Sequence, residues 1–218
     1  MTRDEVRRRI LEVGIVPVVR AASKEQAMAA AQAVCAGGIP IVEITMTVPD
    51  ALDAIRSLVQ TLPRDVLIGA GTVLDAETAR QCFDAGAQFL VSPILDLDTI
   101  ELAKKLGKLT MAGGLTPNEV VAAWKAGTDF VKVFPCGSAG GAAHIRSLKA
   151  AFPQIAMVPT GGVNLETAVQ FLEAGASALG IGGELMPAEM LKRGDMAAIT
   201  DLARQYVALI RPRIHQPI

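Results

Sequence analysis

Apolar and polar positions along the chain follow a pattern that occurs four times. The four segments are AVCAGGIPIVEIT, CFDAGAQFLVSP, AWKAGTDFVKVFP and FLEAGASALGIGG. In each segment a helical spacing of apolar residues stops at Ala-Gly, and a short run of strand-forming residues begins a few positions later. A glycine suits the end of a helix because it adopts the left-handed backbone conformation without steric cost. The pattern therefore predicts helix-to-strand junctions at Gly37, Gly86, Gly127 and Gly175.

Further strand candidates lie between these junctions. They are LIGAGT, LTMAGG and MVPTGG, and IVPVVRA lies near the start of the chain. The eight predicted strands are 15–21, 41–46, 67–72, 89–94, 109–114, 130–135, 156–162 and 178–183. Amphipathic helices are predicted between them, for example over 23–36, where Ser23 is the expected N-cap and Gln26 is expected to complete a capping box.

Eight strand–helix repeats predict a closed (β/α)8 barrel, the TIM-barrel fold of the α/β class. The segment MTRDEVRRRILEVG adds a helix before the first strand. We expect one domain over residues 1–218, because no linker or low-complexity tract interrupts the repeats. A doubly wound open sheet is the alternative, but no G-x-G-x-x-G follows the first strand.

A lysine interrupts the apolar strand FVKVFP. Burial disfavours the charged form of an amine and lowers its pKa. Either the Lys132 side chain reaches solvent, or the protein uses it as a neutral amine. If Lys132 points into the barrel, Phe130 and Phe134 point with it, while Val131 and Val133 face the helices. Barrels of this kind carry their active sites at the C-terminal ends of the strands, which is where Lys132 lies.

The second strand, IVEIT, carries an acid. Glu43 shares the inward face with Ile41 and Thr45, so an acid and an amine enter the barrel from two different strands. A structural salt bridge between Glu43 and Lys132 is one interpretation. The second interpretation is a nucleophile and a proton-transfer group, because buried ionisable groups at strand ends are used in this way.

Paired glycines follow the last two strands. PTGGV follows the seventh strand and GIGGE the eighth, at the positions where such barrels often bind phosphate through backbone N–H groups. The pairs are Gly161-Gly162 and Gly182-Gly183. Either pair alone indicates only a tight turn, whereas both together favour an anion site.

The net charge and the few cysteines and histidines limit the classes of partner and of site that this chain is expected to have. A formal net charge of −1 favours neither nucleic acid nor an anionic membrane as a partner. No signal peptide or membrane-spanning apolar run is recognisable, which predicts a cytoplasmic protein. The cysteines, Cys35, Cys82 and Cys136, form no C-x-x-C pair and are expected to be reduced thiols. The two histidines, His144 and His215, offer little for a metal site or a histidine-based triad.

Seven motifs together carry a family resemblance. In chain order, VEIT, GAGTV, FLVSP, TPNE, VKVFP, PTGGV and GIGG resemble the 2-keto-3-deoxy-6-phosphogluconate/4-hydroxy-2-oxoglutarate (KDPG/KHG) aldolase family, bacterial class I aldolases of the Entner–Doudoroff type. The resemblance covers nearly the whole chain. It implies that Lys132 forms a Schiff base with pyruvate and that Glu43 is the general acid/base. It also implies a homotrimer that needs no cofactor or metal, because the iminium ion serves as the electron sink.

The resemblance also implies a set of substrate-binding residues at the strand ends. Thr72 would contact the pyruvate carboxylate, and backbone N–H groups of the paired glycines would hold a phosphate. Pro93 and Phe134 would wall the pocket, and Arg20 would bind an anion. The full set is Arg20, Thr47, Thr72, Pro93, Phe134, Thr160, Gly161, Gly162, Gly182 and Gly183.

Two positions depart from the family pattern. Thr47 stands where some relatives have an arginine that binds a substrate carboxylate, so recognition of the carboxylate is expected to rest on Thr72, Arg20 or backbone groups. Glu184 stands where some relatives have a serine that touches phosphate. A carboxylate aimed at a phosphate would repel it.

The predicted reaction is cleavage of 2-keto-3-deoxy-6-phosphogluconate to pyruvate and glyceraldehyde 3-phosphate. A related aldolase would act instead on 4-hydroxy-2-oxoglutarate or 2-keto-3-deoxy-6-phosphogalactonate. A different phosphate-binding barrel, such as a sugar-phosphate epimerase or thiamine-phosphate synthase, is a second rival hypothesis. A third is a non-catalytic barrel that serves only as a ligand-binding or assembly scaffold.

Overall fold

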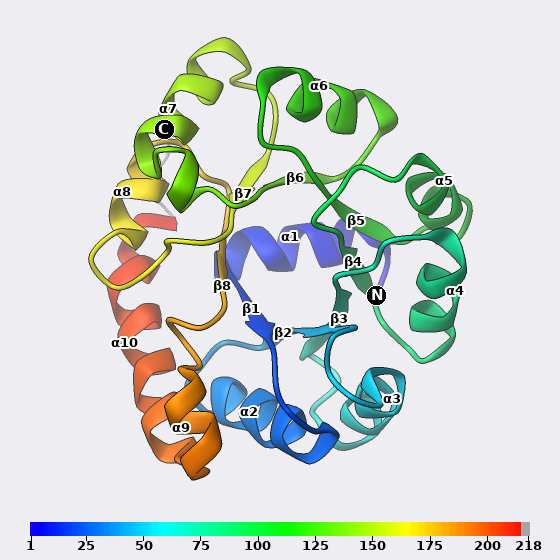
Figure 1. Ribbon diagram of the computed structural model, residues 1–218, viewed down its shortest axis with the longest axis vertical. Coiled ribbons are helices and arrows are strands. Elements are labelled where there is room, and N and C mark those ends of the chain that lie inside the picture. The colour runs from blue at the N-terminus through cyan, green and yellow to red at the C-terminus, as the bar shows by residue number, and fades with distance from the viewer. Residues whose placement is uncertain (215–218) are drawn as a thin grey trace.

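Parallel strands form a ring that helices surround (Figure 1). The computed structural model describes residues 1–214. Each strand from β1 to β6 pairs in parallel with the next, and β8 pairs with β1. An isolated parallel bridge between Thr160 and Gly180 links the last two strands of the ring. The arrangement is the (β/α)8 barrel that the repeats predict.

All eight predicted strands are present. They are β1 (Ile15–Val19), β2 (Ile41–Thr45), β3 (Leu67–Gly71), β4 (Phe89–Val91), β5 (Leu109–Gly113), β6 (Phe130–Val133), β7 (Met157–Pro159) and β8 (Leu179–Ile181). Each ends one to three residues before the predicted boundary. The predicted third strand, for example, loses Thr72, whose φ of 58° is not an extended conformation.

The helices surround the ring of strands, except for α1, which lies across one end of the barrel. They are α1 (Arg3–Val13), α2 (Lys24–Ala36), α3 (Ala51–Thr61), α4 (Ala76–Asp84), α5 (Leu97–Lys105), α6 (Pro117–Ala126), α7 (Ala142–Ala151), α8 (Ala168–Glu173), α9 (Ala188–Arg193) and α10 (Met196–Ile214), with a 3-10 turn η1 (Gly137–Ala139). No helix within residues 1–214 combines the length and the apolar character that crossing a membrane requires.

Two local predictions need correction. Ser23 caps α2 as expected, but the Gln26 side chain accepts from the N–H of Ala22 and not from that of Ser23, so the capping box is incomplete. Gly37 ends α2 with a φ of −78°, and Gly38 takes the left-handed conformation in its place. Gly37 is required for another reason: a Cβ there would lie 2.3 Å from the Cβ of Ala203 on α10.

The buried residues separate into two clusters that correspond to the two faces of the strands. The outer cluster holds Val131 and Val133 and lies between the strands and the helices. The inner cluster holds Phe130 and fills the barrel. The faces of β6 are therefore as the alternation predicts.

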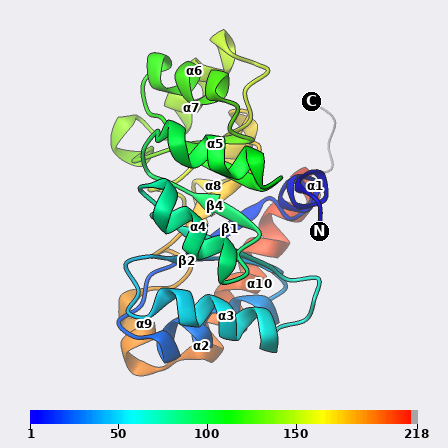
Figure 2. The ribbon, with the colours of Figure 1, turned by 90° about the vertical axis from the view of Figure 1, so that its right-hand side faces the viewer.

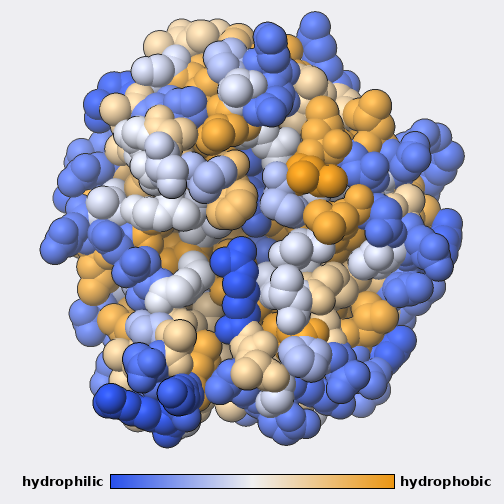
Figure 3. Space-filling view, in the orientation of Figure 1, coloured by the Kyte–Doolittle hydropathy of each residue, from blue (hydrophilic) through white to orange (hydrophobic). Residues whose placement is uncertain are grey.

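Helix α1 and the loops that leave the C-terminal ends of the strands lie at opposite ends of the barrel. Figure 2 shows α1 on one side of the ring, away from the segments that lead out of the C-terminal ends of the strands. Figures 1 and 3 view the molecule from the end where the strands finish. On that face hydrophilic side chains stand at the centre of a ring of paler and apolar residues (Figure 3).

Candidate active site

Lys132 lies inside the barrel on β6. Only 2% of the residue is exposed, and it pairs with Gly113 on one side and Val158 on the other. Its Nζ atom lies 5.4 Å from the centre of the Phe134 ring. Burial lowers the pKa of Lys132, and the positive charge of Arg20 acts in the same direction, whereas Glu43 opposes the shift. The environment therefore favours the neutral, nucleophilic amine.

Glu43 enters the same space from β2. It is 1% exposed, and its Oε1 atom is buried without a hydrogen-bond partner. Burial raises the pKa of Glu43, and the charges of Lys132 and Arg20 oppose that shift. A buried oxygen without a partner carries a free-energy cost, which is expected where a group must meet a ligand. Glu43 is thus suited to hold and release a proton.

The salt-bridge interpretation finds no support. Among residues 1–214 no ion pair includes Glu43 or Lys132. The two groups are near enough to influence each other's pKa, yet neither is satisfied by the other. Each remains available for a reacting molecule.

Strand glycines make room for these side chains. A Cβ at Gly71 would lie within bonding distance of the Glu43 carboxylate. A Cβ at Gly180 would lie 2.1 Å from the Oγ1 atom of Thr160. Reasoning from the sequence missed Gly71 and Gly180 as site residues, although a glycine inside a strand is a known sign of close approach.

Two of the expected carboxylate-binding residues directly follow strands of the barrel, β1 and β3. Arg20 follows β1, is exposed, and places its charge near both Glu43 and Lys132. Thr72 follows β3 with a φ of 58°, a conformation that costs a threonine about 1 to 3 kcal/mol. Such strain is typical of a residue held for function.

The hydroxyl proton of Thr47 is used in a hydrogen bond to Thr45. The Oγ1 of Thr45 donates its single proton to the carbonyl of Val19, 3.0 Å away. Thr45 and Thr47 share a 2.7 Å hydrogen bond, in which Thr47 must therefore be the donor. The Thr47 hydroxyl then offers only lone pairs and is a poor ligand for a carboxylate. This leaves Arg20 and Thr72 as the stronger candidates.

The glycine pairs form two turns with available donors. Gly161 and Gly162 have φ values of 87° and 76°, and a Cβ at Gly162 would lie 2.8 Å from the Cα of Gly137. Within the described chain the N–H groups of Gly161, Gly162 and Gly183 donate to no carbonyl. Glu184 is exposed in the turn that follows β8, four residues before α9 begins. The turns are suited to an anion.

Pro93 and Phe134 lie at the ends of their strands, each partly buried. A Cβ at Gly113 on β5 would lie 2.2 Å from the carbonyl oxygen of Pro93, so the backbone of β5 and the segment after β4 are in contact. Together with the ring of Phe134 beside Lys132, this contact borders the space around the amine.

The remaining chemical candidates, Cys136 and His144, have their side chains bonded to backbone carbonyls. Burial raises the pKa of the Cys136 thiol to about 11, and its Sγ atom contacts the Gly141 carbonyl at 3.6 Å. The Nε2 atom of His144 bonds to the Leu115 carbonyl at 2.8 Å. His215 lies outside the described residues. Cys136 and His144 are engaged with the backbone.

A family model described as "KDPG and KHG aldolase" matches residues 6–202. The chain belongs to this aldolase family. An Escherichia coli K12 protein named KHG/KDPG aldolase is 35% identical over 201 residues, which cover 91% of this chain and 93% of that protein. The chain is therefore an aldolase, a carbon–carbon lyase whose family acts on small keto acids and pyruvate.

Solved structures of KDPG aldolases share the fold of this family member. The 2-keto-3-deoxy-6-phosphogluconate aldolase of Zymomonas mobilis ZM4, solved with 3-phosphoglycerate, has a TM-score of 0.84 and 30% identity, covering 96% of this chain and 97% of that one. A Legionella pneumophila KDPG aldolase has a TM-score of 0.82 and 29% identity, covering 90% and 96%. In the Legionella structure pyruvate was captured as a covalent carbinolamine.

Proposed function

We propose that this aldolase cleaves 2-keto-3-deoxy-6-phosphogluconate to pyruvate and glyceraldehyde 3-phosphate, with Lys132 as the Schiff-base residue and Glu43 as the general acid/base. The observation that carries the proposal is a buried amine and a buried carboxyl without a partner, brought together from β6 and β2. The covalent carbinolamine of the Legionella relative supports an amine as the nucleophile.

The reaction follows from the protonation states that burial favours. Neutral Lys132 attacks the C2 ketone, and the protonated Glu43 carboxyl gives its proton to the hydroxyl that departs as water, which leaves a protonated imine and the Glu43 carboxylate. Glu43, as the carboxylate, takes the proton of the C4 hydroxyl while the C3–C4 bond breaks and its electrons move into the iminium. The aldehyde leaves, the enamine is protonated at C3, and hydrolysis of the imine releases pyruvate and Lys132.

Substrate binding is assigned by charge and hydrogen-bonding capacity. Arg20 and Thr72 hold the C1 carboxylate, because Thr47 donates to Thr45. The turns at Gly161–Gly162 and Gly182–Gly183 hold the phosphate through their N–H groups. The Zymomonas relative was solved with a phosphorylated three-carbon acid, which fits this assignment.

Trapping with pyruvate tests the catalytic assignment. Reduction with borohydride in the presence of pyruvate is expected to leave a pyruvate-derived adduct on Lys132, identified by peptide mass spectrometry. Lys132→Met should give no adduct. An adduct on another lysine, or none in folded wild-type protein, would refute the assignment of Lys132.

Steady-state kinetics test the proton-transfer group and the substrate. Glu43→Gln is expected to lower kcat by about 10²- to 10⁴-fold while an adduct can still be trapped. Specificity constants compared across 2-keto-3-deoxy-6-phosphogluconate, its galactonate epimer and 4-hydroxy-2-oxoglutarate decide the physiological class. A higher value for 4-hydroxy-2-oxoglutarate would favour that substrate, which the name of the E. coli relative includes.

A homotrimer is part of the proposal. It is supported by three apolar side chains that lie exposed on the loops after β3 and β4 and at the start of α5, namely Leu74, Ile94 and Leu97. On the face seen in Figure 3, apolar side chains gather in one region of the rim. The cytoplasmic location predicted from the sequence stays a prediction.

A further inference from the structure

Helix α1 contributes to the interior of the barrel. Val6 and Ile10 are 1% and 0% exposed, and both belong to the inner cluster of buried residues rather than to the outer one. In that cluster they join Phe89 and Phe130, which point inward from the strands. The helix therefore closes the barrel at the end opposite the active-site face (Figure 2).

The inner face of β6 places Phe130 beneath Lys132. The two residues are two positions apart on one strand, so their side chains share a face, with Phe130 nearer to α1. The guanidinium carbon of Arg7 on α1 lies 5.5 Å from the centre of the Phe130 ring. The ring thus lies between the charge of Arg7 and the amine of Lys132.

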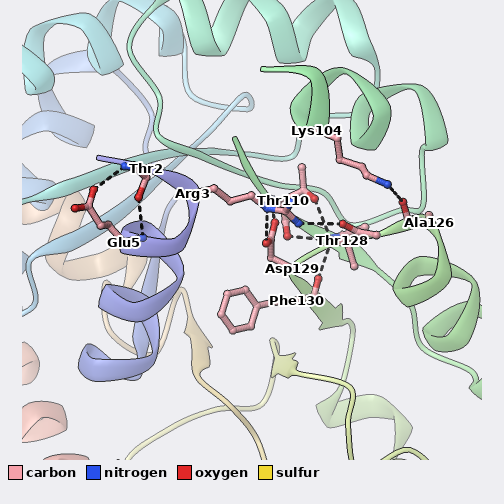
Figure 4. A network of polar contacts seen from close by, with 11 residues as sticks. Thr2, Arg3, Glu5, Lys104, Thr110, Ala126, Thr128, Asp129 and Phe130 are labelled. Carbon is pink, nitrogen blue, oxygen red and sulfur yellow. Dashed lines mark hydrogen bonds and ion pairs between the residues drawn. The ribbon is translucent and has the colours of Figure 1, made fainter. Parts of the chain in front are cut away.

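Polar contacts fasten α1 to the strand that carries Lys132. The Nε atom of Arg3 lies 2.7 Å from Oδ1 of Asp129, the residue immediately before β6. Oδ2 of the same carboxylate accepts from the N–H of Thr110 at 3.0 Å, and Arg3 also donates to the Gly127 carbonyl at 3.3 Å. Figure 4 shows Arg3 reaching from α1 to this network.

We propose that α1 is the floor of the reaction chamber: Val6 and Ile10 seal the N-terminal end of the barrel beneath Lys132 and keep bulk water from its amine. The proposal rests on the proposed role of Lys132 as the nucleophile. Val6 and Ile10 are positioning residues, because they act through Lys132 and touch no substrate. Water admitted from below would solvate the ammonium form, which does not attack a carbonyl.

The charged groups that face Lys132 are separate from the floor. Glu43 faces it from β2 and Arg20 from β1, and both lie toward the strand ends. Arg7 lies on α1 behind the ring of Phe130. A substitution of Val6 or Ile10 leaves all three charges in place. Any change in the pH dependence of Lys132 would therefore reflect a change in how well water solvates its amine.

Two isoleucines provide a matched pair of variants. Ile10 on α1 and Ile55 on α3 are both 0% exposed, but Ile55 belongs to the outer cluster. Ile10→Ala and Ile55→Ala should both lower thermal stability, because each leaves a cavity in a packed core. Ile10 lies in the cluster that fills the barrel on the α1 side of Phe130, whereas Ile55 lies in the cluster outside the strands.

The experiment measures the rate of formation of the borohydride-trapped pyruvate adduct against pH. It is run on the full chain at a temperature where circular dichroism shows each variant folded. The rate should rise with pH as Lys132 loses its proton. In Ile10→Ala the increase in rate should occur at a pH about half a unit higher, or more. At any pH where the wild-type rate is still increasing, the fraction of neutral Lys132 should then be about threefold smaller. Ile55→Ala should keep the wild-type profile.

Val6→Thr is the second floor variant. It preserves the volume and adds a hydroxyl that can hold water beneath the amine, so it tests the idea if Ile10→Ala does not fold. A shift of the profile in the same direction supports the proposal. An unchanged profile in a folded floor variant, or an equal shift in Ile55→Ala, overturns it. Absence of a Lys132 adduct in the wild-type protein overturns the catalytic assignment instead.

Discussion

At the scale of single residues, burial moves Lys132 and Glu43 toward their neutral forms. It lowers the pKa of the amine and raises the pKa of the carboxyl. An amine with a lowered pKa in the folded state makes folding less favourable at pH values below its ordinary pKa, because the unfolded chain binds a proton that the folded chain does not. The neutral amine that the reaction requires therefore lowers the free energy of unfolding at neutral pH.

Lys132→Met is expected to abolish turnover, lowering kcat by about four orders of magnitude or more, and to raise the melting temperature at pH 7. The gain in stability should shrink as pH rises toward 10.5, the ordinary pKa of the amine, since the unfolded chain then loses the same proton. Thermal melts of both proteins across that range test the sign. A variant that is less stable at pH 7 would contradict the neutral-amine interpretation.

Arg20 and Thr47 differ in what they can offer a carboxylate. Arg20→Gln removes a charged donor and should weaken pyruvate binding by about 10- to 100-fold, as expected for loss of a hydrogen bond between charged groups. Thr47→Val should change it by less than about threefold, because the Thr47 proton is engaged by Thr45. Measuring the rate of adduct formation against pyruvate concentration gives the pyruvate affinity of each variant. Equal losses in the two variants would assign a donor role to Thr47.

At the scale of elements, helix caps set where several loops at the active-site face end. The TPNE motif begins α6: Thr116 Oγ1 accepts from the N–H of Glu119, and the Glu119 carboxylate accepts from the N–H of Thr116. These backbone and side-chain hydrogen bonds lower the pKa of Glu119. The motif is thus a complete capping box, and its role in this chain is structural.

Thr116→Ala should lower the free energy of unfolding by about 1 kcal/mol, the typical cost of losing a side-chain cap. The matched variant Thr116→Ser keeps the hydroxyl and should lose much less. Because the folded pKa of Glu119 is lowered, its contribution is present above 4.5, its ordinary pKa, and is lost as pH falls below it. Denaturant titrations at neutral and acidic pH measure the difference, and an equal loss in both variants would argue against the cap.

At the scale of the whole molecule, closure of the barrel brings residues from distant parts of the chain to one end. The loops after β3 and β4 lie at that end, and they carry Leu74 and Ile94, which are 49% and 47% exposed. Leu97, at the start of α5, is 61% exposed, and Leu106, just after the other end of the same helix, is 42% exposed. One helix therefore offers a test residue and a control residue.

Leu97→Glu is expected to disrupt the proposed homotrimer, because a charge would be buried between copies. Leu106→Glu places the same charge at the far end of α5 and should leave assembly unchanged. Size-exclusion chromatography with light scattering measures the mass of each. A trimeric mass for Leu97→Glu would locate the interface elsewhere, and a monomeric wild-type protein would contradict the trimer.

The alternation of apolar and polar residues was sufficient to predict the order of the strands and the faces of the side chains on β2 and β6. Lys132 and Glu43 could be assigned to the interior because strand periodicity is local and a charged residue in an apolar strand stands out. Strand ends were less predictable. They depend on backbone conformations such as that of Thr72, which a short sequence window does not determine.

What the sequence determined by itself is the succession of strands and helices, the inward face of β6 and β2, the N-cap of α2 at Ser23 and the glycines that follow α4, α6 and α8. All of these follow from residues within a few positions of one another. The tertiary structure alone decided that Glu43 requires Gly71, that Thr47 donates to Thr45, and that Arg3 binds Asp129 across 126 positions. Such contacts depend on how the closed barrel places strands beside one another. No local pattern of residues encodes those distances.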